Sequence, residues 1–415
     1  MTTTAGQRRP GAVAGWVAST RQALDRPLTS YYLLLGASTL LLTIGLMMVL
    51  SASSVHSYRT YDGNSYYIFF RQLTWVLLAL PIAFLATRVP HRLLRLLAWP
   101  ALIGSTVLLA LTQVPGMGKE VGGNTNWLAL GPLVIQPSEF AKLAIILWCA
   151  DLYARKEKLL GDWKHTLIPA VPVAGAITLL VIKGGDLGTA LVLFAIVLGM
   201  LWVVGAPARL FMGSLLVVGV LALYLASTSR ERLERLTNFV DPFKNYEGAG
   251  WQAAHGLFAM SSGGWFGKGI SASQQKWGSL PEAHTDFIFA VLGEELGLVG
   301  TLLVLVLFLT IAYAGIRVAL RTEDPFVRYM AAGITIWLMA QMMINIGMVL
   351  ALLPVIGLPL PLVSYGGSAL LPSLVALGLL VSFARAEPGA AAALRARRRR
   401  RAAGVTANGL SRRGK

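Results

Sequence analysis

Long apolar runs separated by short polar stretches fill most of this chain. About ten of these runs approach or exceed the roughly 20 residues that a helix needs to cross a bilayer core. They lie at residues 31–51, 68–87, 93–112, 137–154, 166–182, 187–204, 208–227, 287–316, 327–350 and 363–384. The pattern therefore predicts an all-α membrane protein with about ten transmembrane helices, in one membrane domain over residues 31–386.

The composition favours the same class. Hydrophobic residues make up 55% of the 415 residues and charged residues 13%, whereas soluble domains usually contain about 25% charged residues. About thirty mixed residues precede the first apolar run and no small-residue cleavage site follows it, so we expect a retained anchor rather than a signal peptide. The single cysteine, Cys149, lies inside the fourth run and excludes an internal disulfide.

The positive charge is unevenly distributed along the chain, whose net charge is +17. Arginine and lysine are concentrated in the segments 1–30, 88–95, 155–165, 317–328 and 387–415. By the positive-inside rule both termini are predicted to be cytoplasmic. The longest loop, residues 228–286 between the seventh and eighth spans, is then extracytoplasmic, and its apolar, glycine-rich part at 251–269 is expected to pack against the membrane domain.

The C-terminal segment 387–415 is predicted to be a basic, disordered cytoplasmic tail, with residues 397–401 all arginine. The simplest interpretation is attraction to anionic membrane lipid. A binding site for a partner protein, or a patch that binds nucleic acid, is the alternative. We expect no nucleic-acid partner.

Charged side chains gather at one end of the even-numbered spans. With the topology above, that end lies at the outer face of the membrane. The residues concerned are Arg71, Glu139, Lys142, Asp186, Asp286, Glu294 and Glu295. Ionisable groups at membrane depth are costly and usually functional. The pattern predicts a site that opens outward and contains both cations and carboxylates.

Each of these residues also has a structural interpretation. Glu139 and Lys142 are three residues apart on a helix, so they share a face and can form a buried pair. Asp186 and Asp286 each precede a helix and can act as N-caps. Arg71 can contact a lipid phosphate, and His284 can be an ordinary loop residue.

Two less specific sequence features lie near the last two spans. The segment with Pro354, Gly357, Pro359 and Pro361 predicts a rigid outer connection that must be buried or line a cavity. Asn345 lies inside the ninth span, where an interhelical hydrogen bond is the default expectation.

Four motifs in this order make the chain similar to a known family. They are residues 136–142 (Gln-Pro-Ser-Glu-Phe-Ala-Lys), 186–189 (Asp-Leu-Gly-Thr), 280–297 (with Pro-Glu-Ala-His-Thr-Asp-Phe and Gly-Glu-Glu-Leu-Gly) and 357–368 (Gly-Leu-Pro-Leu-Pro-Leu-Val-Ser-Tyr-Gly-Gly-Ser). The chain resembles the SEDS family of ten-helix peptidoglycan polymerases, typified by FtsW and RodA. The basic tail and residues 241–269 resemble the actinobacterial FtsW branch more than RodA.

Two departures from the family pattern stand out. Gly184 and Gly185 precede the second motif where the family often has Gln-Pro, and Asn126-Trp127 stands where it often has Arg-Trp. The first affects how the chain enters the helix at Asp186. The second weakens any phosphate-binding role for position 126.

The resemblance implies an inverting glycosyltransferase with lipid II as donor and acceptor and undecaprenyl diphosphate as leaving group. It implies that Asp286 is the catalytic carboxylate. Candidate substrate-binding residues are Arg71, Glu139, Lys142, Asp186, Lys268, His284 and Ser364. A metal requirement stays open, with Mg²⁺ or Mn²⁺ as the candidate divalent cation, and no other cofactor is indicated.

The resemblance also implies a class B penicillin-binding transpeptidase as partner, together with other divisome proteins, and a location at the division septum of the cytoplasmic membrane. Three alternatives remain at this point. The chain could be a lipid II flippase or ion-coupled transporter, an elongation polymerase of RodA type, or a scaffold without chemistry of its own. Transporters place ionisable groups near the bilayer midplane, whereas here they collect at one face.

Overall fold

The computed structural model describes residues 26–390 and 392–393, except for residues 122–123, 132, 228–240, 245 and 249. The predictions for the N-terminal tail up to residue 25 and for the basic tail after residue 393 lie outside this range, as does the start of the long outer loop.

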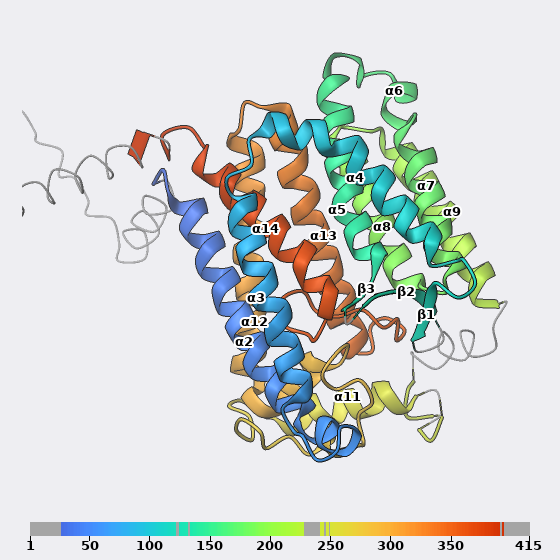
Figure 1. Ribbon diagram of the computed structural model, residues 1–415, viewed down its shortest axis with the longest axis vertical. Helices are drawn as coiled ribbons and strands as arrows, with labels where there is room; N and C mark the ends of the chain where they lie inside the picture. The colour runs from blue at the N-terminus through green and yellow to red at the C-terminus, as the bar shows by residue number, and fades with distance from the viewer. Residues whose placement is uncertain are drawn as a thin grey trace, which may run out of the picture.

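A helix lies at each of the ten predicted spans (Figure 1). These helices are α2 (Thr29–Thr60), α3 (Tyr67–Ala86), α4 (His91–Leu111), α5 (Pro137–Arg155), α7 (Ala170–Lys183), α8 (Leu187–Val203), α9 (Ala208–Ser227), α12 (Ile288–Arg321), α13 (Pro325–Val349) and α14 (Leu370–Arg385). The short elements between them are η1 (Glu157–Leu159), α6 (Trp163–Leu167), α11 (Trp251–Ser262), η2 (Gln275–Trp277) and η3 (Gly367–Ala369). The fold class predicted from the apolar runs is confirmed.

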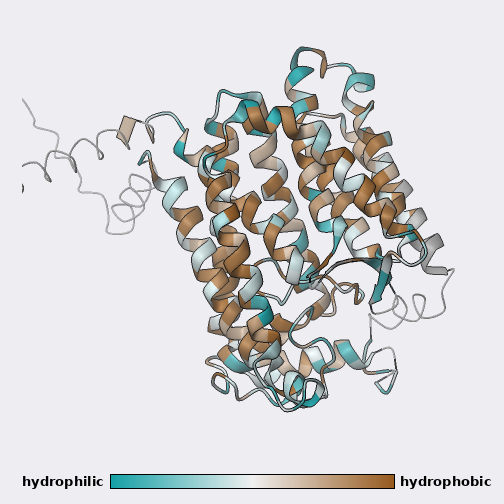
Figure 2. Ribbon diagram, in the orientation of Figure 1, coloured by the Kyte–Doolittle hydropathy of each residue, from teal (hydrophilic) through white to brown (hydrophobic). Residues whose placement is uncertain are grey.

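The bundle is built around α13 and α14. Their most apolar stretches are 72% and 78% buried, against 28% for α3 and α4. Helix α13 packs against α5, α8 and α12, while α14 packs against α2 and α3. Figure 2 shows apolar residues along the middle of the bundle and polar ones at both ends. The outer helices therefore expose the apolar surface that lipid covers.

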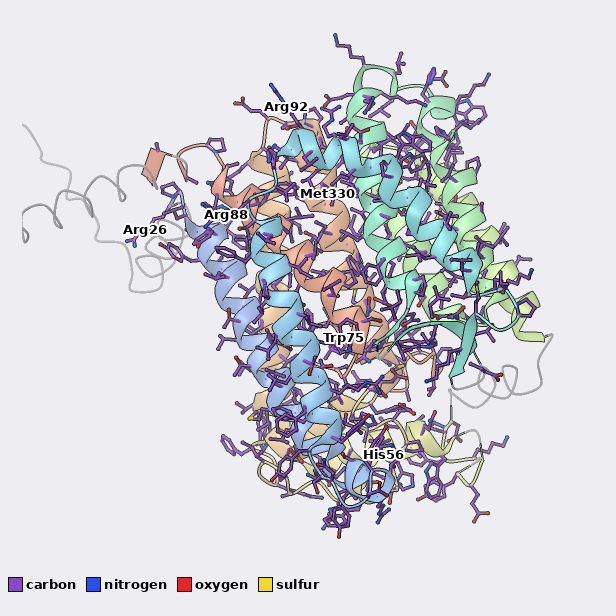
Figure 3. The ribbon with its side chains drawn as sticks, in the orientation of Figure 1. Arg26, His56, Trp75, Arg88, Arg92 and Met330 are labelled. Atoms are coloured by element: carbon purple, nitrogen blue, oxygen red, sulfur yellow. The ribbon has the colours of Figure 1, made fainter. Side chains whose placement is uncertain are left out.

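The two ends of the bundle differ in charge. Arg26, Arg88 and Arg92 lie at the same end, and His56 lies at the opposite end (Figure 3). This distribution agrees with the positive-inside assignment. We call the arginine-bearing end the inner end and the His56 end the outer end.

A three-stranded antiparallel sheet, which the apolar pattern does not predict, lies in the outer loop between α4 and α5. Its strands are β1 (Gly118–Val121), β2 (Asn124–Leu130) and β3 (Leu133–Ile135), in the order β1-β2-β3. The amide of Thr125 in β2 donates to the carbonyl of Gly184 (3.1 Å), so the sheet is fixed to the turn that precedes α8. The sheet thereby closes the outer end over α5 and α8.

Helix α12 is interrupted at Gly297, where φ is 69° and ψ is −165°. A turn formed by residues 263–269 fills the break. Lys268 N and Gly269 N donate to the carbonyls of Glu294 (2.9 Å) and Glu295 (3.0 Å), which end the first part of the helix.

The second part of α12 receives the complementary bonds. Leu298 N and Val299 N donate to the carbonyls of Gly264 (2.9 Å) and Trp265 (3.1 Å). The backbone groups that a helix break would leave unpaired are thus satisfied by the turn. Helix α11, just before the turn, packs against α12 and α13. The expectation that residues 251–269 pack against the membrane domain is confirmed.

Candidate functional site

Asp286 lies in the turn that leads into α12, at the outer end. Phe287 is the N-cap of α12, and no side chain caps this helix, so the N-cap interpretation of Asp286 is wrong. A Cβ added to Gly357 would lie 3.3 Å from Asp286 Oδ2, so the carboxyl group abuts the outer connection between α13 and α14. Within the described part of the chain, no donor forms a hydrogen bond to the Asp286 carboxylate.

The surroundings of Asp286 disfavour its charged form. Burial raises the pKa of Asp286 from 3.8 to about 7, and the negative charges of Glu282 and Asp186 add to the effect. A carboxyl group whose pKa lies near the working pH can both accept and return a proton. Asp286 therefore has the properties expected of an acid–base residue.

His284 lies two residues before Asp286, within an aromatic group. Its ring stacks on His56 from α2 (centroids 5.3 Å apart) and lies 5.7 Å from the ring of Tyr365. Burial lowers the pKa of His284 to about 4, assisted by His56 and opposed by Glu282. The imidazole is therefore neutral at physiological pH and can donate or accept one hydrogen bond at a ring nitrogen.

Asp186 is the N-cap of α8, which confirms the structural interpretation of this residue. Its Oδ1 accepts from Thr189 N (2.8 Å), and its Oδ2 accepts from Thr189 Oγ1 (2.7 Å) and Gln136 Nε2 (3.0 Å). Its charge nevertheless contributes to the raised pKa of Asp286. The structure thus brings together two of the predicted carboxylates, one fixed by hydrogen bonds and one without them.

Glu139 and Lys142 form the predicted pair, with Nζ 2.8 Å from Oε1. Lys142 is fully buried and also donates to Gln341 Oε1 (3.0 Å) on α13. The Gln341 amide in turn donates to the carbonyl of Pro359 (2.9 Å). The pair is therefore linked to the outer connection through Gln341. Direct contact of either residue with a substrate stays a prediction.

Residues 350–366, the outer connection, are non-helical, as the prolines predict. Its second half, residues 358–364, is mostly buried, whereas residues 350–357 are partly or fully exposed. Side chains from neighbouring helices satisfy its carbonyls: Asn345 Nδ2 donates to Leu358 O (2.6 Å) and Gln72 Nε2 to Ser364 O (3.4 Å). Ser364 is buried, and its Oγ accepts from Leu360 N (2.8 Å). The hydroxyl of Ser364 thus stabilises its own loop, and its substrate-binding role stays a prediction.

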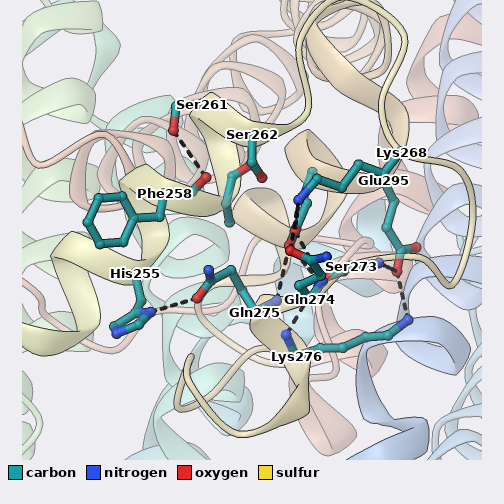
Figure 4. A network of polar contacts seen from close by, with 12 residues as sticks. His255, Phe258, Ser261, Ser262, Lys268, Ser273, Gln274, Gln275, Lys276 and Glu295 are labelled. Atoms are coloured by element: carbon teal, nitrogen blue, oxygen red, sulfur yellow. Dashed lines mark hydrogen bonds and ion pairs between the residues drawn. The ribbon is translucent and has the colours of Figure 1, made fainter.

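Glu294 and Glu295 form ion pairs with lysines of the loop before α12, and Figure 4 shows Lys268, Lys276 and Glu295 in this network. Lys268 Nζ lies 2.8 Å from Glu294 Oε1, and Lys276 Nζ lies 2.8 Å from Glu295 Oε1. Glu294 also accepts from Ser273 Oγ (2.6 Å). These contacts hold the loop 268–276 against the first part of α12. Lys276 is not predictable as part of this network, because a single lysine in a polar loop belongs to no recognisable sequence pattern.

Arg71 on α3 is the remaining cationic candidate. It is partly exposed and forms no ion pair with any described residue. Its charge lies close enough to Tyr365 to act on that hydroxyl. Among the predicted cations Lys142 and Lys268 are paired, so Arg71 is the one whose charge is available to an anionic ligand.

The described residues contain no group of three or more His, Cys, Asp or Glu side chains arranged to hold a metal ion. The carboxylate of Asp186 already accepts three hydrogen bonds. The side chains present therefore do not fit a ready-made metal centre.

Comparison with known proteins agrees with this architecture. Residues 31–388 match the model of the family described as cell cycle protein FTSW_RODA_SPOVE. A probable peptidoglycan glycosyltransferase FtsW of Mycobacterium tuberculosis is 43% identical over 375 residues, covering 90% of this chain and 71% of the relative. The stage V sporulation protein E of Bacillus subtilis is 37% identical over 355 residues, covering 85% of this chain and 96% of the relative.

Solved structures show the same fold. One, described as the structural coordination of polymerization and crosslinking by a peptidoglycan synthase complex, matches with a TM-score of 0.67 and 29% identity over 85% of this chain and 97% of that one. The rod shape determining protein RodA of Thermus thermophilus matches with a TM-score of 0.61 and 30% identity over 86% of this chain and 97% of that one. Together with the bundle and the motifs around Asp286, these matches show that the chain belongs to the FtsW/RodA/SpoVE family of multi-pass membrane proteins.

Proposed function

We propose that this chain is a peptidoglycan glycosyltransferase that polymerises lipid II at the outer face of the cytoplasmic membrane. The observation that carries the proposal is the state of Asp286: a carboxyl group at the outer end, without a hydrogen-bond donor among the described residues, whose pKa is raised to about 7. The printed name of the mycobacterial relative supports the same activity.

Asp286 acts as the general base. The C4 hydroxyl of the acceptor GlcNAc gives its proton to Asp286, and its oxygen attacks C1 of the donor MurNAc. The bond between C1 and the diphosphate oxygen breaks, and undecaprenyl diphosphate leaves with the electron pair. Attack from the face opposite the leaving group inverts C1 and forms a β-1,4 linkage. A sugar hydroxyl is a weak nucleophile, so removal of its proton in the transition state accelerates the reaction by about 10²- to 10⁴-fold.

Arg71 stabilises the leaving diphosphate. Charge that develops on a phosphate oxygen is best stabilised by a fixed cation in a site of low dielectric. Arg71 is partly exposed and has no ion pair among the described residues, whereas Lys142 and Lys268 each have a carboxylate partner. In this mechanism Glu139, Lys142 and Asp186 stabilise the segments that surround the site and do not take part in bond formation. His284 acts as a neutral hydrogen-bonding group beside the base.

We further propose a septal role and a class B penicillin-binding transpeptidase as partner. Relatives named FtsW support division over elongation. The peptidoglycan synthase complex among the solved structures, whose description couples polymerization to crosslinking, supports the partner. Depletion of the protein tests the assignment: filamentous cells without septa are expected, and rounded cells would favour an elongation polymerase instead.

A lipid II flippase is the second candidate. Such a carrier needs ionisable groups near the midplane that are reached from both sides. Glu139 and Lys142 are buried and paired with each other, whereas Asp286 and Arg71 lie at the outer end. The geometry favours the polymerase.

The experiment uses the full-length protein in lipid nanodiscs, alone and with its transpeptidase partner, supplied with fluorescent lipid II. Wild type should give glycan chains on a gel, and Asp286→Ala should give none while remaining folded. Glu282→Gln is the matched control, since Glu282 is an exposed carboxylate in the same turn; it should retain polymerisation, with the pKa of Asp286 somewhat lowered because one neighbouring negative charge is gone. Unchanged polymerisation by Asp286→Ala would sink the assignment, and transbilayer movement of lipid II without polymer would favour the flippase.

A further inference from the structure

Two separate chain segments meet at Asp286. One is the turn 281–287 that leads into α12, and the other is the outer connection, which passes the carboxyl group at Gly357. Gly357 has φ of 77°, and an added Cβ would lie 3.3 Å from Asp286 Oδ2. Only a residue without a side chain lets the backbone come this close in that conformation. The exposure of the carboxyl group to water therefore depends on how closely the two segments are held together.

Asn345 on α13 binds both segments with one amide group. Its Nδ2 lies 2.8 Å from the carbonyl oxygen of Asp286 and 2.6 Å from that of Leu358. An amide nitrogen has two hydrogens, so both are used. Since both neighbours are acceptors, the nitrogen must face them. Asn345 is fully buried, which fixes its orientation and keeps water from replacing it.

We infer that Asn345 is a positioning residue for the reaction, which holds Asp286 against the outer connection and so maintains the carboxyl group as an effective base. The inference rests on the proposed function of Asp286. It also assigns a task to the polar residue near the outer, C-terminal end of α13, for which the apolar pattern predicts only an interhelical hydrogen bond. Asn345 acts through the backbone of Asp286 and need not contact substrate.

Loss of Asn345 should act on Asp286 in a specific direction. With the bridge gone, the turn and the outer connection separate and water reaches the carboxyl group. Its pKa then falls towards the ordinary value, because burial is the largest cause of the shift. The other charges that act on Asp286 come from Glu282 on the same turn and Asp186 at the start of α8, and His284 is neutral at physiological pH. These groups are unchanged by the substitution.

The test measures lipid II polymerisation by the full-length protein in nanodiscs with its partner, between pH 5.5 and 8.5. In wild type the acid limb of kcat/KM should fall near the pKa of Asp286. Asn345→Ala should lower kcat by about 10-fold or more, with KM changed less than about threefold. Its acid limb should move to lower pH by about one unit.

Gln72→Leu is the matched control. Gln72 is also a buried amide that donates to a carbonyl of the outer connection, but at Ser364 rather than beside Asp286. This variant should lose stability and keep the wild-type acid limb. If Asn345→Ala does not fold, Asn345→Ser, whose single hydroxyl cannot reach both carbonyls, provides the same readout.

An acid limb that stays at the wild-type pH in the Asn345 variant would overturn the inference, whatever the loss of rate, because a merely structural residue would lower activity without moving the pKa of the base. Movement of the limb in both Asn345 and Gln72 variants would also overturn it. Failure of the proposed function looks different, since wild type itself would then form no glycan.

Discussion

The side chain of Asn126 lies directly against the backbone of Gly184: a Cβ added to Gly184 would fall 1.6 Å from Asn126 Oδ1. These are two positions at which the sequence departs from the pattern often seen in the family, and they are in contact. Asn124 approaches Gly185 in the same way, at 2.5 Å from an added Cβ. Strand β2 and the turn before Asp186 are therefore closely fitted to each other.

Gly184→Ala should destabilise the protein by about 1–3 kcal/mol, because the methyl group overlaps the Asn126 amide in a close-packed contact. Asn126→Ala should recover most of the loss, since both polar atoms of the buried Asn126 amide lack partners among the described residues. Thermal unfolding of the two single variants and the double variant in detergent measures the coupling. Additive effects would show that the two positions are independent.

Asp286→Asn should stabilise the protein in a pH-dependent manner. The folded-state pKa of Asp286 is about 7 against 3.8 for the ordinary side chain, so the folded state retains the proton that the unfolded state releases. The stability of wild type therefore falls as pH rises from about 4 to about 7. The advantage of the Asn variant should be at most a few kcal/mol above pH 7, shrink as pH falls, and vanish below pH 4.

Melting temperatures of wild type and Asp286→Asn, compared at each pH, test this prediction. Glu282→Gln is the control, since Glu282 is exposed and should give a much smaller difference. A melting-temperature difference that does not change between pH 5 and 8 would contradict the raised pKa.

Gly297→Ala should be severely destabilising, by about 3 kcal/mol or more, since φ of 69° with ψ of −165° is accessible in practice to glycine alone. An added Cβ would also lie 2.3 Å from the amide nitrogen of Gly267. Gly104→Ala in α4, where nothing lies within 4 Å of the added Cβ, is the control and should be neutral or slightly stabilising. Equal effects of the two substitutions on expression and melting would argue against a break in α12.

Lys276→Met should cost about 3–5 kcal/mol, because it leaves Glu295 buried without its cation. Glu295 would still accept from Ser51 Oγ (2.6 Å), which is too weak a partner for a full charge. Lys268→Met should cost less, since Lys268 is 30% exposed and Glu294 keeps the hydroxyl and backbone donors of 273–275. Chemical or thermal unfolding of the two variants, with Lys276→Met/Glu295→Gln as the compensating double variant, measures the difference.

The membrane fold is predictable from the sequence because the signal is long-range and repeated. Each span needs only apolar length, and the arginines of the inner loops set the orientation. The pair Glu139–Lys142 and the N-cap at Asp186 were also predictable, since both depend on spacing within one helix. The break at Gly297 was not, because a glycine in an apolar helix is usually tolerated and only the turn 263–269 makes this one a discontinuity.

The position of the candidate site at the outer end was predictable from the sequence. Which charged groups pair with each other inside it was not. Topology places all the outer charges together, and only tertiary contacts reveal that Lys142, Lys268 and Lys276 each have a carboxylate of their own. The hydrogen-bond partners of Asn345 were likewise not predictable from the sequence. Its type and depth indicate a hydrogen bond, but its two acceptors come from segments whose meeting no local pattern encodes.

The break in α12 bears on how far the proposed catalytic site lies from the hydrocarbon of the membrane. The part of the helix after Gly297 is about 36 Å long at roughly 1.5 Å per residue, which by itself crosses a hydrocarbon core of about 30 Å. The part before Gly297 is then left to extend beyond the hydrocarbon, with Asp286 in the turn just before it. In the proposed mechanism, the polyprenyl tails of a lipid-linked sugar would therefore remain among the acyl chains, and the acceptor hydroxyl would meet its base at the level of the headgroups.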